Sequence, residues 1–325
     1  MASMMSASCF GMAASPPQHK IPLILDTDIG DDMDDTWALM MLLRSPVFDI
    51  KLITTGFGNT HYRTRLLAKL LETLGHAHIP VGVGLNPTDE PGNQSAWLGD
   101  YSLNEYPGQV HKDGIDALIA TIKQSSEPVT LLCVGPVMNI AEALRRDPSI
   151  ASNAKFVGMY GSIRIGYDGQ KTPSAEWNVK VDPASLQQVF AAPWACAITP
   201  LDTCGLVQLK GANYQTILQS QDPWMQILID NYRIWLPKAT WLDPRPDIEA
   251  MSSTLFDTVA VHLAHSEEFL IMEDLPLSVT DEGYTVIDEQ NGRIVRCATG
   301  WKDLPAFEAR LTEVVSGRMV QEALA

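Results

Sequence analysis

The sequence of 325 residues predicts an α/β fold built on a doubly wound, mostly parallel sheet with helices on both faces. Two observations indicate this class: short apolar strands alternate with segments of helical apolar spacing, and acidic or glycine-containing loops follow the strands. Sheets of this kind bind ligands beyond the carboxyl ends of their strands. No linker rich in Pro, Gly and Ser divides the chain, so we expect one domain over residues 21–325 after a disordered leader over residues 1–20.

The first elements alternate as the fold class requires. An apolar run at residues 21–25 predicts a buried strand, and residues 36–44 show helical spacing that ends at Ser45 and Pro46. Residues 49–55 predict the second strand. The next helix has an apolar face made of five leucines, Leu66, Leu67, Leu70, Leu71 and Leu74, and Gly75 closes it.

The later elements continue this alternation and then change character. In order, they are a strand at residues 129–134, a helix at 138–146, and strands at 156–160 and 194–199. Near the end of the chain, residues 283–288 and 292–297 are typical of a small C-terminal β-hairpin. A final helix is expected over about residues 305–315.

The composition limits the classes of function. Asp and Glu number 39 against 23 for Lys and Arg, so the net charge is −16. Such a surface repels phosphate backbones, and no apolar run approaches the roughly 20 residues that cross a bilayer. We therefore expect neither nucleic acid nor membrane as a partner. Five scattered cysteines without a CxxC pair favour a cytoplasmic location; export is the alternative, because Ala13-Ala14-Ser15 resembles a signal-peptide cleavage site.

The acidic loop at residues 26–35 is the most informative segment. It carries six carboxylates in ten positions: Asp26, Asp28, Asp31, Asp32, Asp34 and Asp35. Carboxylates this close raise each other's pKa unless a cation lies among them. The loop lies between an apolar strand and an apolar helix, so a hard divalent cation with oxygen ligands is the natural partner. It is not an EF-hand, because no helix precedes it and no Glu stands at the twelfth position.

Four further motifs follow the acidic loop in order. They are residues 54–59 (TTGFGN), residues 135–141 (GPVMNIA), residues 175–178 (AEWN) with Asp182-Pro183, and residues 255–257 (LFD). Together with the acidic loop they resemble the inosine-uridine preferring nucleoside hydrolase family. The usual family signature places its acidic pair two residues closer to the glycine than this chain does. The resemblance implies the nucleoside hydrolase fold and a homodimer or homotetramer.

The implied activity is calcium-dependent hydrolysis of the N-glycosidic bond of ribonucleosides to ribose and free base. By resemblance, the calcium ligands are Asp28, Asp35, the backbone carbonyl of Val134, and Asp257, and Asp28 is also the candidate general base. The substrate-binding residues implied in the same way are Asp34, Asn59, Met159, Gln170, Glu176, Asn178 and Phe256. Asp26 is expected behind the ligands, and Asp32 could take the place of Asp34.

Two departures from the family pattern bear on the substrate. Phe256 stands where one branch has a histidine that protonates the leaving base, and Phe cannot donate a proton. Another branch stacks the purine on an aromatic ring, which predicts a modest preference for purine ribosides. Trp97 is either a second wall of that site or a core residue. Gln170 stands where the family has an asparagine that reaches the 5′ hydroxyl, and it is one methylene longer.

Two other functions remain as alternatives. A haloacid-dehalogenase-like phosphatase also places Asp-x-Asp after its first strand, with Asp26 as nucleophile and Asp28 as acid. That class gives no role to Glu176 or Asp257 and needs a downstream lysine that we do not find. The second alternative is a ribose-binding homologue without turnover, which Phe256 and Gln170 motivate. Release of free base from a panel of nucleosides separates it from the hydrolase.

Overall fold

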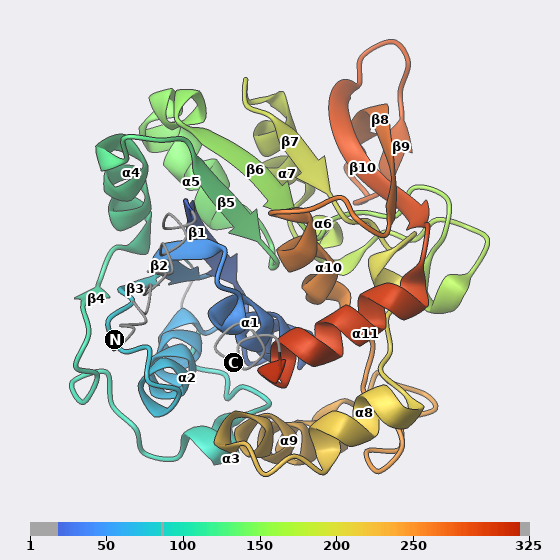
Figure 1. Cartoon of the computed structure of the whole chain (residues 1–325). Coiled ribbons are helices and arrows are strands. Elements are labelled where there is room, and N and C mark those ends of the chain that lie inside the picture. The colour runs from blue at the N-terminus through green and yellow to red at the C-terminus, as the bar shows by residue number, and fades with distance from the viewer. Residues whose placement is uncertain (1–18, 86–87, 319–325) are drawn as a thin grey trace, which may run out of the picture.

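The computed structural model describes residues 19–85 and 88–318, so the predicted leader lies almost wholly outside the described residues. The strands are β1 (Ile21–Thr27), β2 (Phe48–Thr55), β3 (Val81–Val83), β4 (Val110–His111), β5 (Val129–Cys133), β6 (Ala154–Gly158), β7 (Cys196–Ile198), β8 (Leu270–Val279), β9 (Thr285–Ile287) and β10 (Arg293–Trp301). They form one sheet in the order β4-β3-β2-β1-β5-β6-β7-β10-β8-β9 (Figure 1).

The sheet is mostly parallel, as predicted. Every pair from β4 across to β10 is parallel, and only the pairs of β8 with β10 and of β9 with β8 are antiparallel. The chain builds outward from β1 to β4 and then returns to place β5 on the other side of β1. The strand order therefore reverses between β1 and β5, which is where open α/β sheets hold their ligands.

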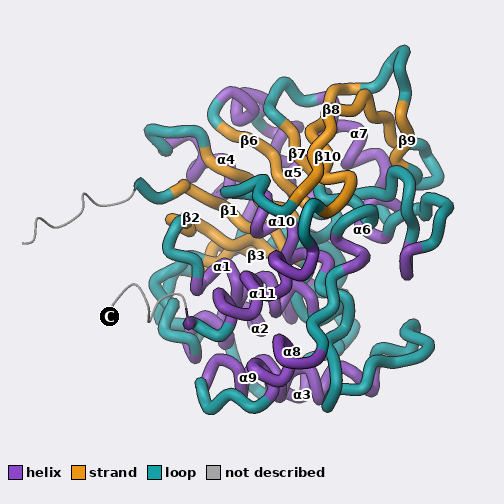
Figure 2. Tube along the Cα trace, turned by 45° about the vertical axis from the view of Figure 1, so that its right-hand side comes forward, coloured by secondary structure: helices purple, strands orange, loops and turns teal. Residues whose placement is uncertain are grey.

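Helices cover both faces of the sheet (Figure 2). One face carries α1 (Asp34–Arg44), α2 (Thr60–Thr73), α8 (Gly211–Leu218), α9 (Pro223–Trp235), α10 (Phe256–Leu263) and α11 (Leu304–Val315). The other carries α4 (Gly114–Gln124), α5 (Met138–Arg146) and α7 (Pro183–Ala191). The remaining helices are α3 (Ser95–Leu98), α6 (Trp177–Lys180) and the 3₁₀ turns η1 (Pro148–Ser152), η2 (Tyr167–Gly169), η3 (Cys204–Leu206) and η4 (Leu236–Lys238).

The apolar core has two layers because strand side chains alternate in direction. Leu23 and Leu25 belong to the layer beneath α1, whereas Ile24 belongs to the layer beneath α4 and α5. A strand buried on both faces reads as a continuous apolar run, which explains why residues 21–25 could be assigned from sequence. None of the helices in the described ranges is long and apolar enough to cross a membrane.

The C-terminal strands are antiparallel as expected, but their pairing differs from the predicted hairpin. Residues 285–287 (β9) do not pair with β10; both strands pair with β8, which lies between them. Strand β8, whose interior holds Pro276, was not predicted from the sequence. Proline has no N–H to donate and argues against an inner strand, although the Pro276 carbonyl still accepts the N–H of Asp288 at 2.8 Å.

Candidate functional site

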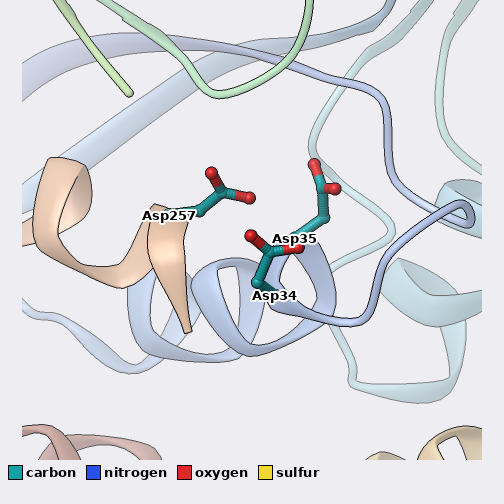
Figure 3. Close-up of side chains that lie close together, drawn as sticks. All are labelled: Asp34, Asp35 and Asp257. Carbon is teal, nitrogen blue, oxygen red and sulfur yellow. The ribbon is translucent and has the colours of Figure 1, made fainter. Parts of the chain in front are cut away.

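Three buried carboxylates meet at the carboxyl edge of the sheet. Asp34 and Asp35 begin α1, Asp257 lies in the first turn of α10, and these two helices pack against each other. Oxygen atoms of the three side chains lie within 4.8 Å of one another (Figure 3). The residues are only 6%, 4% and 2% exposed. Residues more than 220 positions apart in the chain are thus brought to one place by helix packing.

The electrostatics of this cluster favour a cation. Burial, and then the neighbouring carboxylates, hold the pKa values of Asp34, Asp35 and Asp257 well above the ordinary range. Burial likewise raises the pKa of Asp28 to about 6, although the charge of Arg63 opposes the shift. Arg63 itself pairs with Asp31, at 3.6 Å. Like charges held together away from water are stabilised by protons or by a metal ion.

Asp28 follows β1 and lies against the loop after β5. A Cβ atom added to Gly135 would come within 2.5 Å of the Asp28 Oδ1 atom, so glycine is required for this close approach. The strands β1 and β5 are neighbours in the sheet, and the backbone N–H of Val134 donates to the Asp26 carbonyl at 2.9 Å. The Asp28 carboxylate and the Val134 backbone therefore lie at the ends of adjacent strands.

Asp26 is held behind this edge, as expected from its place in the strand. Its Oδ1 atom accepts hydrogen bonds from the Thr54 hydroxyl and from the Asn139 side-chain amide, the latter at 2.7 Å. Its Oδ2 atom is buried without a partner in the described structure, and burial raises its pKa to about 7. Sequence reasoning gave Asn139 no role, although it stands in the GPVMNIA motif.

Asn178 and Glu176 connect the backbone segments on another side of the site. The Asn178 Nδ2 atom donates to the carbonyl oxygens of Val134 (2.9 Å) and Met159 (3.2 Å). Glu176 caps α6: its Oε1 atom accepts the Asn178 N–H at 2.8 Å, and its Oε2 atom accepts the Gly161 N–H at 3.0 Å. Burial raises the pKa of Glu176 to about 7. The ends of β5 and β6 and the start of α6 are thus joined.

Other predicted residues lie at the margins of this arrangement. The Asn59 side chain is occupied by the backbone, since it accepts the Tyr62 N–H and donates to the Glu90 carbonyl at 3.0 Å. Gln170 is exposed just after η2. Phe256 is the first residue of α10, half-buried. Trp97 packs against the core cluster, with the Lys69 ammonium 4.5 Å from its ring centroid.

Two residues that organise the acidic loop were missed by sequence reasoning. Arg63, only 5% exposed, donates to the backbone carbonyls of Phe57 (2.7 Å), Asp28 and Ile29 (3.2 Å). The Thr27 hydroxyl donates to the Asp35 carboxylate. Arg63 lies on a helix whose apolar spacing predicts only packing against the core. The sequence around it therefore does not indicate its contact with the acidic loop.

The fold and this buried polar edge define an α/β protein with its site at the carboxyl ends of parallel strands. The chain matches the family model described as inosine-uridine preferring nucleoside hydrolase over residues 23–319. It belongs to that family and is accordingly a hydrolase acting on N-glycosyl compounds. The family assignment confirms the resemblance found in the sequence and replaces the phosphatase alternative.

Several related proteins give this assignment its context. Probable uridine nucleosidase 1 of Oryza sativa subsp. japonica is 28% identical over 238 residues, or 69% of this chain and 72% of that protein. A pyrimidine-specific ribonucleoside hydrolase of Salmonella agona is 29% identical over 225 residues, or 65% and 70%. Among solved structures, a plant nucleoside hydrolase has a TM-score of 0.77 at 19% identity, covering 93% of this chain and 99% of that one. A purine-preferring ribonucleoside hydrolase from Gardnerella vaginalis has a TM-score of 0.73 at 23% identity, covering 91% and 98%.

Proposed function

We propose that this protein hydrolyses ribonucleosides to ribose and free base with a calcium ion bound by Asp28, Asp35, Asp257 and the Val134 carbonyl. The observation that carries the proposal is the convergence of the buried Asp34, Asp35 and Asp257 carboxylates within 4.8 Å, at the edge of the sheet where Asp28 also lies. All donors in this set are oxygens, which calcium prefers. The Val134 oxygen also accepts the Asn178 amide, but a carbonyl oxygen has two lone pairs and can serve both partners.

Calcium, when bound, would lower the pKa of a water molecule and hold ribose hydroxyls. Asp28 is the proposed general base. Burial raises the pKa of Asp28 to about 6 without the ion, and a bound cation favours the carboxylate form, so Asp28 is ionised at neutral pH and can accept a proton from water. The backbone bonds from Arg63 to Asp28 and Ile29 keep this segment in place.

Asp34, Glu176 and Asn178 are proposed to bind the ribose. Cleavage of an N-glycosidic bond develops positive charge on the sugar ring, and the carboxylates stabilise that charge electrostatically. Asn178 is fixed by two backbone carbonyls, so its position does not have to be organised during the reaction.

We propose that purine ribosides react faster than uridine or cytidine. Phe256 cannot protonate a leaving base, and its half-buried ring offers a stacking surface beside Asp257. Stacking helps a purine, whose ring nitrogen is easily protonated, more than a pyrimidine. The relatives carry names that specify uridine, pyrimidines or purines, so the preference is argued from Phe256 alone.

A chromatographic assay of released base tests the proposal. Inosine, guanosine, adenosine, uridine and cytidine are incubated with the full chain in calcium, alongside Asp28→Asn. A matched control is Asp202→Asn, which alters a buried carboxylate bonded instead to the N–H groups of Ile163 and Arg164. We expect release by the wild type and the control and a loss of at least about 1000-fold in Asp28→Asn. No release from any nucleoside would favour the ribose-binding alternative.

The remaining expectations are proposals of the same kind. We propose a homodimer or homotetramer, a cytoplasmic location and one domain over residues 21–325. Light scattering of the purified chain tests the first of these, and limited proteolysis tests the last.

A further inference from the structure

Tyr167 lies between the two halves of the proposed substrate site. It begins η2, and its ring meets Phe256 edge to face, with centroids 6.1 Å apart. Its hydroxyl oxygen accepts the backbone N–H of Trp177 at 2.8 Å. Trp177 stands between Glu176 and Asn178, the proposed ribose-binding pair. The phenol is therefore fixed at its ring by the proposed base-binding residue and at its oxygen by the ribose-binding segment.

The hydroxyl proton of Tyr167 has no acceptor among the residues that the structure describes. A phenol donates one hydrogen bond and accepts others, so the bond from Trp177 leaves its donor unused. Burial and the nearby Glu176 and Asp34 carboxylates all hold the pKa of Tyr167 above its ordinary value. The group stays protonated at neutral pH, and its O–H is available to a ligand.

Gln170, which the family resemblance assigns to the 5′ hydroxyl, is turned to solvent. Its backbone closes the turn that carries Tyr167: the Gln170 N–H donates to the Tyr167 carbonyl at 3.1 Å, and the Gln170 carbonyl accepts the Gly166 N–H at 2.9 Å. The Tyr167 side chain, three residues earlier in the chain, reaches instead the backbone N–H of Trp177, the residue that follows Glu176.

We propose that Tyr167 donates a hydrogen bond to the 5′ oxygen of the bound nucleoside and thereby selects substrates with a free 5′ hydroxyl. This inference rests on the proposed function, in which the vicinal 2′ and 3′ hydroxyls face the carboxylate cluster. The remaining hydroxyl of the ribose is then the one at C5′. It can donate to Glu176 while accepting from Tyr167, because a hydroxyl does both. A 5′ phosphate would meet the charges of Glu176 and Asp34 and is disfavoured.

The test compares two substrates on two proteins. The kcat/KM values of inosine and 5′-deoxyinosine are measured for the wild type and Tyr167→Phe in calcium. We expect Tyr167→Phe to lower kcat/KM for inosine about 10-fold and to leave that for 5′-deoxyinosine unchanged, because this substrate lacks the acceptor. The ratio between substrates on one protein does not depend on how much of that protein is folded. The matched control is Tyr284→Phe, which alters an exposed tyrosine just before β9 and should leave both values unchanged.

Three results would contradict the inference in different ways. If Tyr167→Phe lowered kcat/KM equally for inosine and 5′-deoxyinosine, the hydroxyl would act on the leaving base or in packing. That result would contradict the 5′ contact but not the proposed hydrolase activity. If Gln170→Ala lowered kcat/KM for inosine alone, and Tyr167→Phe changed neither value, the contact with the 5′ hydroxyl would belong to Gln170. No base release by the wild type from either substrate would contradict the proposed function and this inference together.

Discussion

The side-chain amide of Asn178 donates to the backbone carbonyl oxygen of Val134 across 2.9 Å. One of these residues is the proposed ribose contact and the other the proposed carbonyl ligand of calcium. The same amide also holds the Met159 carbonyl, so it joins the ends of β5 and β6 to the start of α6. A change at Asn178 should therefore reach both the sugar and the metal side of the site.

Replacing Asn178 by Ala should lower turnover more than it weakens ground-state binding. The lost bond acts mainly in the transition state, and its removal costs about 2–4 kcal/mol, or roughly 30- to 1000-fold in rate. The measurement is kcat and KM for inosine in both proteins. A 2′-deoxynucleoside should suffer a comparable loss on the wild type, and equal rates on ribo- and deoxyribonucleosides would contradict this placement of the ribose.

Replacing Asp257 by Asn should stabilise the chelator-treated protein and abolish its response to calcium. The change removes one of three buried like charges, so Tm without metal should rise by about 2 °C or more. With calcium, only the wild type should gain stability, by binding linkage. Calorimetry with and without the ion measures both effects.

Asp202→Asn is the matched control for this experiment. The Asp202 carboxylate already accepts two backbone N–H groups, each at 2.8 Å, and an amide can satisfy only one of them. This variant should lose stability equally with and without calcium. A lower Tm of metal-free Asp257→Asn, with the calcium response intact, would show that Asp257 is not a ligand.

The metal-free protein should become less stable as the pH rises from 5 to 8. Burial raises the pKa of Asp26 and Asp32 to about 7, whereas an unfolded chain has Asp values of about 4. Between these values the folded state binds more protons, so the free energy of unfolding falls with increasing pH. Calcium should reduce this fall, because its charge lowers the pKa values of the surrounding carboxylates in the folded state. A chelated protein whose Tm rises over this range would contradict the buried-carboxylate description.

Replacing Phe256 by His should narrow the difference between purine and pyrimidine ribosides. Histidine restores a proton donor that a pyrimidine needs more than a stacked purine does. Phe256→Ala should slow inosine and guanosine chiefly, because it removes the ring. The values of kcat/KM for inosine, guanosine and uridine on the three proteins measure this. The stacking hypothesis would be contradicted if the wild type preferred uridine and Phe256→Ala left kcat/KM for the purine ribosides unchanged.

Much of the fold follows from local sequence. Strands buried on both faces, such as β1 and β5, appear as short apolar runs, and the predicted helix at residues 138–146 coincides with α5. The short strands β3 and β4 carry too few residues for a periodic pattern. Strand β8 alternates buried Leu275, Leu277 and Val279 with more exposed residues, but Pro276 obscured that signal.

The candidate site, like the fold, could be predicted only in part from the sequence. The acidic loop is dense enough to indicate a cation site without any structure, because its carboxylates are neighbours in sequence. Asp257 could be added only through the family resemblance, since its approach to Asp34 depends on how α10 packs on α1. Arg63 and Tyr167 were out of reach, because their partners are distant backbone groups that leave no pattern around either residue.

Calcium titration of chelator-treated protein tests the calcium-dependent hydrolysis most directly. Inosine is supplied in excess, and released hypoxanthine is followed as calcium is added, while a parallel sample reports the bound ion per chain. We expect negligible release in chelator and recovery of activity in proportion to calcium bound, with neither binding nor recovery in Asp257→Asn. Full hydrolysis by a protein shown to contain no divalent metal would contradict the claim.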